Sequence, residues 1–171
     1  MTKRLLTIDD LLALKWVSDP QLSPDGTRVV FVHTVVDRAA NTYRAHLWMV
    51  SIAGGEVRQF TSGEQRDAQP RWSPDGRWIA FLSDRGVSEA APGTRRPKKL
   101  YIIPADGGEA QLLVPHAYHP SDIAWAPDGQ RLAFVGKLPH DEPSSDVKVI
   151  TRIRYKSDGD GFWDGRYQHV F

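Results

Sequence analysis

Two histidines, His116 and His119, have a spacing at which they could bind a metal ion together with Asp122. Imidazole nitrogens and carboxylate oxygens are common zinc ligands, and a zinc site needs at least three protein ligands of this kind. The pair lies between Pro115 and Pro120, in a stretch typical of a connecting segment rather than of a helix that would place both rings on one face. The sequence therefore favours a connection over a metal site.

The segment 158–161, Asp-Gly-Asp-Gly, is similar to the start of a calcium-binding loop. An EF-hand loop continues with further oxygen ligands and ends on an acidic twelfth residue. Here Phe162 stands at the next ligand position and no acidic twelfth residue follows, so a tight turn is the favoured interpretation. No Walker or dinucleotide-binding glycine pattern occurs, and we expect no metal and no cofactor.

Basic residues recur at alternate positions of the segment 147–156. If the segment is a strand, alternate residues share a face. One face would carry Val147, Val149, Thr151, Ile153 and Tyr155, and the other Lys148, Ile150, Arg152, Arg154 and Lys156. The basic face either pairs with carboxylates of a neighbouring strand or lines a cavity and holds an anionic group such as a peptide carboxylate. The second interpretation makes Arg152 and Arg154 candidate substrate-binding residues.

A further basic cluster, residues 95–99, would attract phosphates, but a charge run of this kind is more commonly a solvated loop, and we assign it no function. The whole chain has 22 basic and 21 acidic residues, a net charge of +1. This balance gives no general attraction to nucleic acid or to an anionic membrane, and we expect neither partner.

No catalytic nucleophile is visible in these residues. The chain has no Gly-x-Ser-x-Gly elbow, and its serine, histidine and aspartate residues form no local pattern that indicates a triad. It has no cysteine, which excludes disulfides and thiol catalysis. We therefore expect no catalytic residue within this segment.

Three copies of one turn organise the chain and predict the strands on either side of it. They are Ser23 to Gly26, Ser73 to Gly76 and Ala126 to Gly129, which recur after 50 and 53 residues. In each, proline presets the backbone for a type I turn and glycine takes the left-handed conformation that closes a bulged hairpin. The structural turn residues are Pro24, Asp25, Gly26, Pro74, Asp75, Gly76, Pro127, Asp128 and Gly129.

The strand after the turn is apolar on both faces. In the segment 78–82, Trp78, Ala80 and Leu82 would face one way, and Ile79 and Phe81 the other. An antiparallel sheet usually keeps one face in water, so a sheet that is apolar on both faces needs neighbours on both sides, as the blades of a propeller have.

The rest of each repeat completes a four-stranded blade. A variable loop, residues 34–46 or 84–99, leads to a third strand, a Gly-Gly turn and a last strand, residues 57–60 or 110–114. We expect an all-β fold with about three such blades: blade 1 over residues 19–63, blade 2 over 67–115 and blade 3 over 119–171, all part of a β-propeller region 19–171.

A short helix is expected before the propeller, within an amino-terminal lead over residues 1–18. Thr7 and Asp10 have the spacing of a capping box, and Ile8, Leu11 and Leu12 share a face of a helix over residues 8–15. That face either leans on the propeller or docks on another domain.

The length predicts that this chain is part of a larger protein. A propeller usually needs four or more blades, and 171 residues at a period near 50 supply about three. The last residues, 168–171, are typical of another strand, so the sequence ends inside a blade. Carboxylates interrupt the apolar stretch near the start, which argues against a signal peptide, and we expect a cytoplasmic location.

Several of these segments resemble the WD40-like propeller repeat of TolB-type proteins and of prolyl oligopeptidase family peptidases. They are Trp-Ser-Pro-Asp-Gly at 72–76, Ile-Ala-Phe at 79–81, Ser-Asp-Arg at 83–85, Leu-Tyr at 100–101 and Gly-Gly-Glu at 107–109. The lead-in segments 9–15, 17–26 and 31–32, and the segment 154–171 with its Arg-Tyr-Lys start, are similar to stretches of acylaminoacyl-peptidase-type enzymes, a branch of that family.

The resemblance implies an amino-terminal propeller, commonly seven-bladed, followed by an α/β-hydrolase domain that carries the serine peptidase triad and is absent from this sequence. It implies that the propeller limits access of substrates to short, N-acylated or free peptides, and that the protein forms a homo-oligomer. The expected partners are the rest of the propeller and the hydrolase domain, in the same protein or in a retained, nicked chain. The alternative is a TolB-like propeller that binds a protein partner without chemistry.

Overall fold

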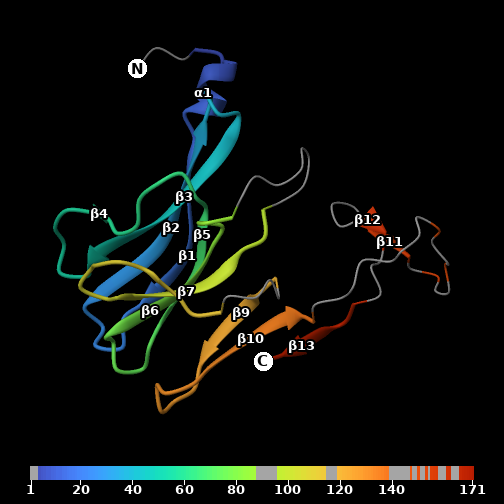
Figure 1. Cartoon of the computed structure of the whole chain (residues 1–171). Coiled ribbons are helices and arrows are strands. Elements are labelled where there is room, and N and C mark those ends of the chain that lie inside the picture. Colours follow the sequence, from blue (N-terminus) through green and yellow to red (C-terminus); the bar gives the residue numbers. More distant parts are fainter. Residues whose placement is uncertain are drawn as a thin grey trace.

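The described part of the chain is β-structure with one short helix, as the computed structural model in Figure 1 shows. The structure describes residues 4–87, 96–114, 119–138, 147, 150, 153, 155–157, 161–162 and 166–171. Its helix, α1, comprises Ile8–Leu12, and no helix within the described residues has the length and apolar character to cross a bilayer. The strands form three stacked sheets and one small ribbon.

The first sheet contains four consecutive strands in chain order, β1-β2-β3-β4. They are β1 (Lys15–Leu22), β2 (Arg28–Asp37), β3 (Thr42–Ser51) and β4 (Arg58–Gln59). All neighbours are antiparallel, and β2 pairs with β3 without interruption from Arg28 opposite Ser51 to Asp37 opposite Thr42.

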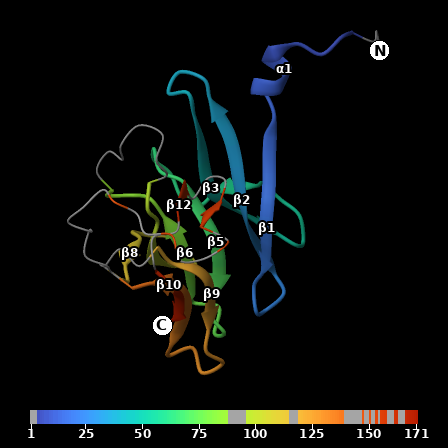
Figure 2. The same cartoon turned by 90° about the vertical axis from the view of Figure 1, so that its right-hand side faces the viewer.

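The second sheet repeats this order with β5 (Asp67–Trp72), β6 (Trp78–Ser83), β7 (Lys99–Pro104) and β8 (Gln111–Leu112). The third contains β9 (Ser121–Trp125), β10 (Leu132–Lys137) and β13 (Gln168–Val170), in the order β13-β10-β9. The ribbon pairs β11 (Lys156–Ser157) with β12 (Gly161–Phe162). Figures 1 and 2 show the three sheets one behind the other, with the long hairpin of β2 and β3 extending toward α1.

The three predicted turns are confirmed. Gly26, Gly76 and Gly129 have φ angles of 71°, 70° and 68°, in the left-handed region that glycine adopts without strain. In the first turn the Ser23 hydroxyl accepts a hydrogen bond from the Arg28 N–H at 2.9 Å and donates one to Asp25 at 2.5 Å. This hydroxyl and the Thr27 N–H hold the pKa of Asp25 down at about 2.

The sheets pack through both apolar faces, as the alternation in β6 predicts. Ile79 and Phe81 face the first sheet and pack with Val30, Leu47 and Met49 in one core cluster. Ala80 and Leu82 face the third sheet and pack with Leu100, Ile123 and Phe134 in a second cluster. The core thus lies between successive sheets, and the middle sheet is covered on both sides.

Each sheet has a bulge in its first strand, at the fourth residue before the turn. Asp19, Gln69 and Asp122 have φ angles of 48°, 52° and 51°, which are uncommon for residues other than glycine. The pairing register shifts at each of these sites. The bulges bring neighbouring sheets together: Asp19 pairs with Arg71 at 2.9 Å, and the Asp122 N–H donates to the Gln69 amide oxygen at 2.9 Å.

A tryptophan at the end of the first strand joins each later sheet to the one before it. The Trp72 indole N–H donates to the Gln21 carbonyl at 3.1 Å, and the Trp125 indole N–H donates to the Arg71 carbonyl at 3.0 Å. The first sheet has Leu22 at this position, and its side chain is 58% exposed. The two hydrogen bonds therefore fix the stacking of the second and third sheets.

Some expectations from the sequence are wrong in detail. Most of residues 34–46, predicted as a variable loop, belongs to β2 and β3, and only residues 38–41 form the turn between them. The last strands of the first two sheets are two residues long instead of four or five. The helix ends at Leu12 rather than at residue 15, because β1 begins at Lys15.

Candidate functional site

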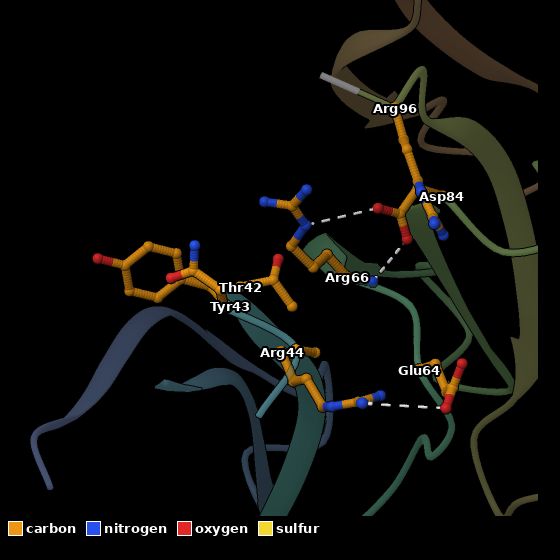
Figure 3. Close-up of a pocket in the computed structure, with 9 residues that line it drawn as sticks. Thr42, Tyr43, Arg44, Glu64, Arg66, Asp84 and Arg96 are labelled. Atoms are coloured by element: carbon orange, nitrogen blue, oxygen red, sulfur yellow. Dashed lines mark hydrogen bonds and ion pairs between the residues drawn. The ribbon is translucent and has the colours of Figure 1, made fainter. Parts of the chain in front are cut away.

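A pocket of about 340 Å³ lies at the end of the first two sheets where β3 begins and β6 ends (Figure 3). Its walls come from the β2–β3 turn, the start of β3, the connection between β4 and β5, the end of β6 and the residue Arg96 that precedes β7. The lining residues are Ala40, Asn41, Thr42, Tyr43, Arg44, Glu64, Arg66, Asp84 and Arg96. The pocket is therefore polar, with three arginines against two carboxylates.

Arg44 has its charge neutralised within the protein. Its Nε lies 2.5 Å from Asp37 of the same hairpin, and its Nη2 lies 3.9 Å from Glu64 across the pocket (Figure 3). The Asp37 carboxylate raises the pKa of Arg44 further, so the guanidinium stays charged at all relevant pH values. Arg44 thus forms a wall of the pocket rather than a vacant binding group.

Arg66 is held from one side only. The Asp84 carboxylate accepts a hydrogen bond from the Arg66 backbone N–H at 2.6 Å, and its other oxygen lies 3.5 Å from the Arg66 Nε. Asp84 is 4% exposed, whereas Arg66 is 37% exposed. Figure 3 shows the terminal nitrogens of Arg66 directed away from Asp84. The inner edge of this guanidinium is therefore fixed and its outer edge remains accessible.

A buried carboxylate, Asp67, is the residue that follows Arg66 and begins strand β5. It is fully buried, accepts a hydrogen bond from the Thr61 hydroxyl at 2.5 Å and pairs with Arg85 at 3.1 Å. Burial alone would raise the pKa of Asp67, but the polar groups of His46, Ser83 and Thr61 and the charge of Arg85 together lower it. Asp67 is therefore an ionised structural group that fixes the start of β5.

The Ser83-Asp84-Arg85 segment is held in place by hydrogen bonds and aromatic contacts beside this site. Ser83 Oγ accepts hydrogen bonds from the Arg85 backbone N–H at 3.2 Å and from its Nε at 3.0 Å. The guanidinium lies 5.0 Å from the Phe81 ring centre and 5.2 Å from that of Tyr101, within the range of cation–π attraction. The segment thus joins the end of β6 to the β4–β5 connection and positions Asp84 beneath Arg66.

The helix α1 stands at the same end of the molecule, beside the tip of the β2–β3 hairpin (Figure 1). Its Asp9 pairs with Arg38 of that hairpin at 2.9 Å. A capping box between Thr7 and Asp10 starts the helix, as predicted, and the helix has no buried residue. Its neighbourhood exposes apolar side chains: Leu5, Leu6, Ile8, Leu11 and Leu14 are between 46% and 89% exposed.

The structure places few of the site residues expected from the sequence. Arg152 and Arg154 lie outside the described residues, as do His116, Asp158, Asp160 and Arg95. No group of three or more potential metal ligands occurs within the described part of the chain. Of the described part of the basic cluster, residues 96–99, Arg96 alone lines the pocket.

Arg44, Arg66 and Asp84 were not identified as pocket residues from the sequence. Arg66 and Asp84 are 18 residues apart and meet only because β5 and β6 form a hairpin. The pocket lining as described contains no histidine; besides its charged groups it offers the Asn41 amide and the Thr42 and Tyr43 hydroxyls, which can donate and accept hydrogen bonds.

Comparisons with known proteins agree with this architecture. The family model for the dipeptidyl peptidase IV N-terminal region matches residues 23–87. The chain is 35% identical to "Uncharacterized peptidase YuxL" of Bacillus subtilis over 98% of its own length and 26% of that protein. It is 35% identical to "Dipeptidyl-peptidase 5" of Porphyromonas gingivalis over 48% of its length and 12% of that protein. The chain thus spans about a quarter or less of these relatives.

Among solved structures, acylaminoacyl peptidase from Pyrococcus horikoshii matches 93% of this chain and 23% of its own, with a TM-score of 0.70 and 20% identity. The β-propeller domain of the trilobed protease from Pyrococcus furiosus matches 73% of this chain and 35% of its own, with a TM-score of 0.54 and 19% identity. At this identity these likenesses show the fold.

The stacked sheets, each opening with the same bulge and turn, define the chain as part of a β-propeller. The matched family region and the peptidase-named relatives make this propeller similar to the amino-terminal propeller region of prolyl oligopeptidase family peptidases.

Proposed function

We propose that this chain is the propeller portion of a serine peptidase, and that the propeller admits short, possibly N-acylated peptides to an active site on a separate α/β-hydrolase domain. The observation that carries the proposal is the 35% identity to a peptidase-named relative over 98% of this chain. Because the peptidases that this chain resembles carry their serine triad on the hydrolase domain, the proposal assigns the chemistry to that domain.

The outer face of the first sheet supports a larger ring. Val29 and Phe31 of β2 occupy the positions that Ile79 and Phe81 occupy in β6, where they face the preceding sheet. Val29 and Phe31 are only half-buried in this chain. We propose that a further blade covers them, and that the sheets correspond to blades over residues 19–63, 67–115 and 119–171.

We propose that α1 and the apolar residues around it dock on the hydrolase domain. Five exposed apolar side chains within ten residues are costly to leave in water, at roughly 25 cal/mol per Å² of apolar surface.

In the full-length protein, Leu11→Ser should speed hydrogen exchange of both α1 and the hydrolase surface that covers it. Leu113→Ser, at a 43% exposed site in the loop after β8, is the control. Unchanged exchange in Leu11→Ser would show that α1 has no such contact.

The peptidase proposal is tested on the full-length protein with short acylated peptides, short free peptides and a folded protein as substrates. We expect hydrolysis of short peptides, loss of activity with a serine-directed inhibitor, and no cleavage of the folded protein. Absence of hydrolysis with every peptide, together with stable binding of a protein partner, would instead support a TolB-like binding module. A cytoplasmic location and a homo-oligomer belong to the same proposal and are tested by cell fractionation and native mass spectrometry.

Arg152 and Arg154 remain proposed substrate-binding residues within this function. Replacing both by Met in the full-length protein should raise KM for peptides with a free carboxylate more than for the corresponding amides. An equal change for both substrates would assign the two arginines to a structural ion pair.

A further inference from the structure

The accessible edge of Arg66 has the features of a prepared anion-binding group. Among the described residues its two terminal nitrogens have no hydrogen-bond or ion-pair partner, whereas its backbone N–H and Nε are both directed at Asp84. Because Asp84 is 4% exposed and fixed at the end of β6, the guanidinium is oriented before any ligand arrives. Such preorganisation reduces the conformational entropy that binding would otherwise cost.

The surroundings of Arg66 favour a ligand with a single negative charge. The pocket lining has a net charge of +1, from three arginines and two carboxylates. Arg44 already pairs with Asp37 and Glu64, which leaves Arg66 and Arg96 as the pocket cations whose outer side meets no carboxylate among the described residues. A carboxylate matches the guanidinium fork in geometry, and it meets less repulsion from Glu64 and Asp84 than a doubly charged phosphate would.

The neighbouring side chains suit a peptide rather than an isolated ion. Tyr43 presents a half-exposed ring that packs edge-on against Trp16, with 5.8 Å between the ring centres. Asn41 and Thr42 add neutral hydrogen-bonding groups. A volume of about 340 Å³ has room for a side chain or a chain end. We propose that this pocket binds a carboxylate of a peptide substrate, either its carboxyl terminus or an acidic side chain, through the outer edge of Arg66.

This inference rests on the proposed peptidase function, because it names the substrate class of that enzyme. It concerns a site distinct from Arg152 and Arg154, which lie outside the described residues. Its expected consequence is a preference for acidic or free-carboxyl peptides that depends on Arg66.

The test uses full-length protein and four fluorescent peptides that differ in two places only. The carboxyl terminus is a free acid or an amide, and one internal residue is Glu or Gln. Binding is measured by fluorescence anisotropy, with intact peptide verified by mass spectrometry, so the measurement does not depend on cleavage. The variants are Arg66→Gln, which removes the charge, and Arg66→Lys, which keeps the charge but loses the fork. Arg77→Gln is the control, because Arg77 is 79% exposed at the β5–β6 turn, at the opposite end of its sheet.

We expect wild-type protein to bind a peptide with one of the two carboxylates, the free carboxyl terminus or the Glu side chain, about tenfold more tightly than the matching neutral peptide. This is the affinity that a charged hydrogen bond implies. Arg66→Gln should abolish that preference while leaving binding of the Gln amide peptide unchanged, Arg66→Lys should retain part of it, and Arg77→Gln should match wild type. Loss confined to the terminal acid identifies the chain end as ligand, and loss confined to the Glu peptides identifies a side chain.

Equal weakening of all four peptides by Arg66→Gln, or no change in any of them, would overturn the inference. So would displacement of the peptide by inorganic phosphate at lower concentration than by acetate, since that result would define a phosphate site. A protein that binds the acidic peptides through Arg66 but cleaves no peptide would refute the peptidase proposal while leaving the site intact.

Discussion

Replacing Asp67 by Asn removes the charge of the buried carboxylate and keeps its shape. Asp67 is fully buried, and its partner Arg85 is 24% exposed. Removing one member of a buried pair costs about 3–5 kcal/mol, and the partial exposure of Arg85 lowers the expected cost to about 2–3 kcal/mol. We therefore expect the opening free energy of β5 and β6 to fall by that amount.

The assay is hydrogen exchange, read by mass spectrometry on peptides from β5 and β6, because it reports the opening of these strands without assuming that the whole protein unfolds in two states. Asp106→Asn is the control: Asp106 is 96% exposed in its ion pair with Arg28, and its loss should cost below about 1 kcal/mol. A double-mutant cycle with Arg85→Met isolates the pair. The double variant should be less destabilised than the sum of the two single variants.

The effect of Asp67→Asn should also depend on pH, with a defined sign. The folded-state pKa of Asp67 lies below its ordinary value of 3.8, so the carboxylate stabilises the fold above that value and its contribution is lost as the pH falls toward the folded pKa. The difference in opening free energy between wild type and Asp67→Asn should therefore be largest at pH 7 and should shrink below pH 3.8. Additive single effects in the cycle, or a difference that grows on acidification, would refute this account of the network.

Three further predictions concern the repeated turn and the contacts between sheets. Trp72→Phe removes the hydrogen bond to the Gln21 carbonyl and should cost about 1 kcal/mol, seen as faster hydrogen exchange in β1; unchanged exchange in β1 would contradict this role. Gly76→Ala forces a side chain into a φ of 70° and should lower the unfolding midpoint by the equivalent of about 1–2 kcal/mol, and Gly76→Asn should be milder; an Ala variant as stable as wild type would be inconsistent with the left-handed turn. Asp25→Asn should reduce stability at neutral pH, and this loss should shrink as the pH falls from 3.8 through about 2, since the pKa of Asp25 is lowered to about 2; a loss that stays the same in acid would show that the charge is not responsible.

The sequence was sufficient to predict the repeated unit of the fold. The proline and glycine of each turn restrict the backbone locally, so the turns at Gly26, Gly76 and Gly129 follow from residue type alone. The alternation in β6 likewise predicts two buried faces, and both core clusters confirm it. These features depend on short-range chemistry that a single segment contains.

The length of the β2–β3 hairpin was not predicted. Polar residues occupy much of residues 38–46, which is typical of a loop, yet β3 begins at Thr42 because it pairs with β2 along its whole length. The last strands of the first two sheets, β4 and β8, are shorter than predicted. Only two residues of each one pair with the neighbouring strand.

The pocket could not be predicted because its members come from separate strands. Arg66 meets Asp84, and Asp67 meets Arg85, through the β5–β6 hairpin, and no spacing rule marks such a pair in the sequence. The helix could be predicted from its capping box. The exposure of its apolar side chains could not, because it depends on which other elements lie beside the helix, and among the described residues none covers them.

The consecutive strand order of the first two sheets has a consequence for how the chain folds. The first sheet draws all its strands from residues 15–59 and the second from residues 67–112, so every backbone pairing within them is between near neighbours in sequence. Short sequence separations favour fast formation, and a growing chain can complete one such unit before the next is synthesised. The tryptophan of each new unit would then attach it to the unit already formed, and assembly would proceed in the direction of translation.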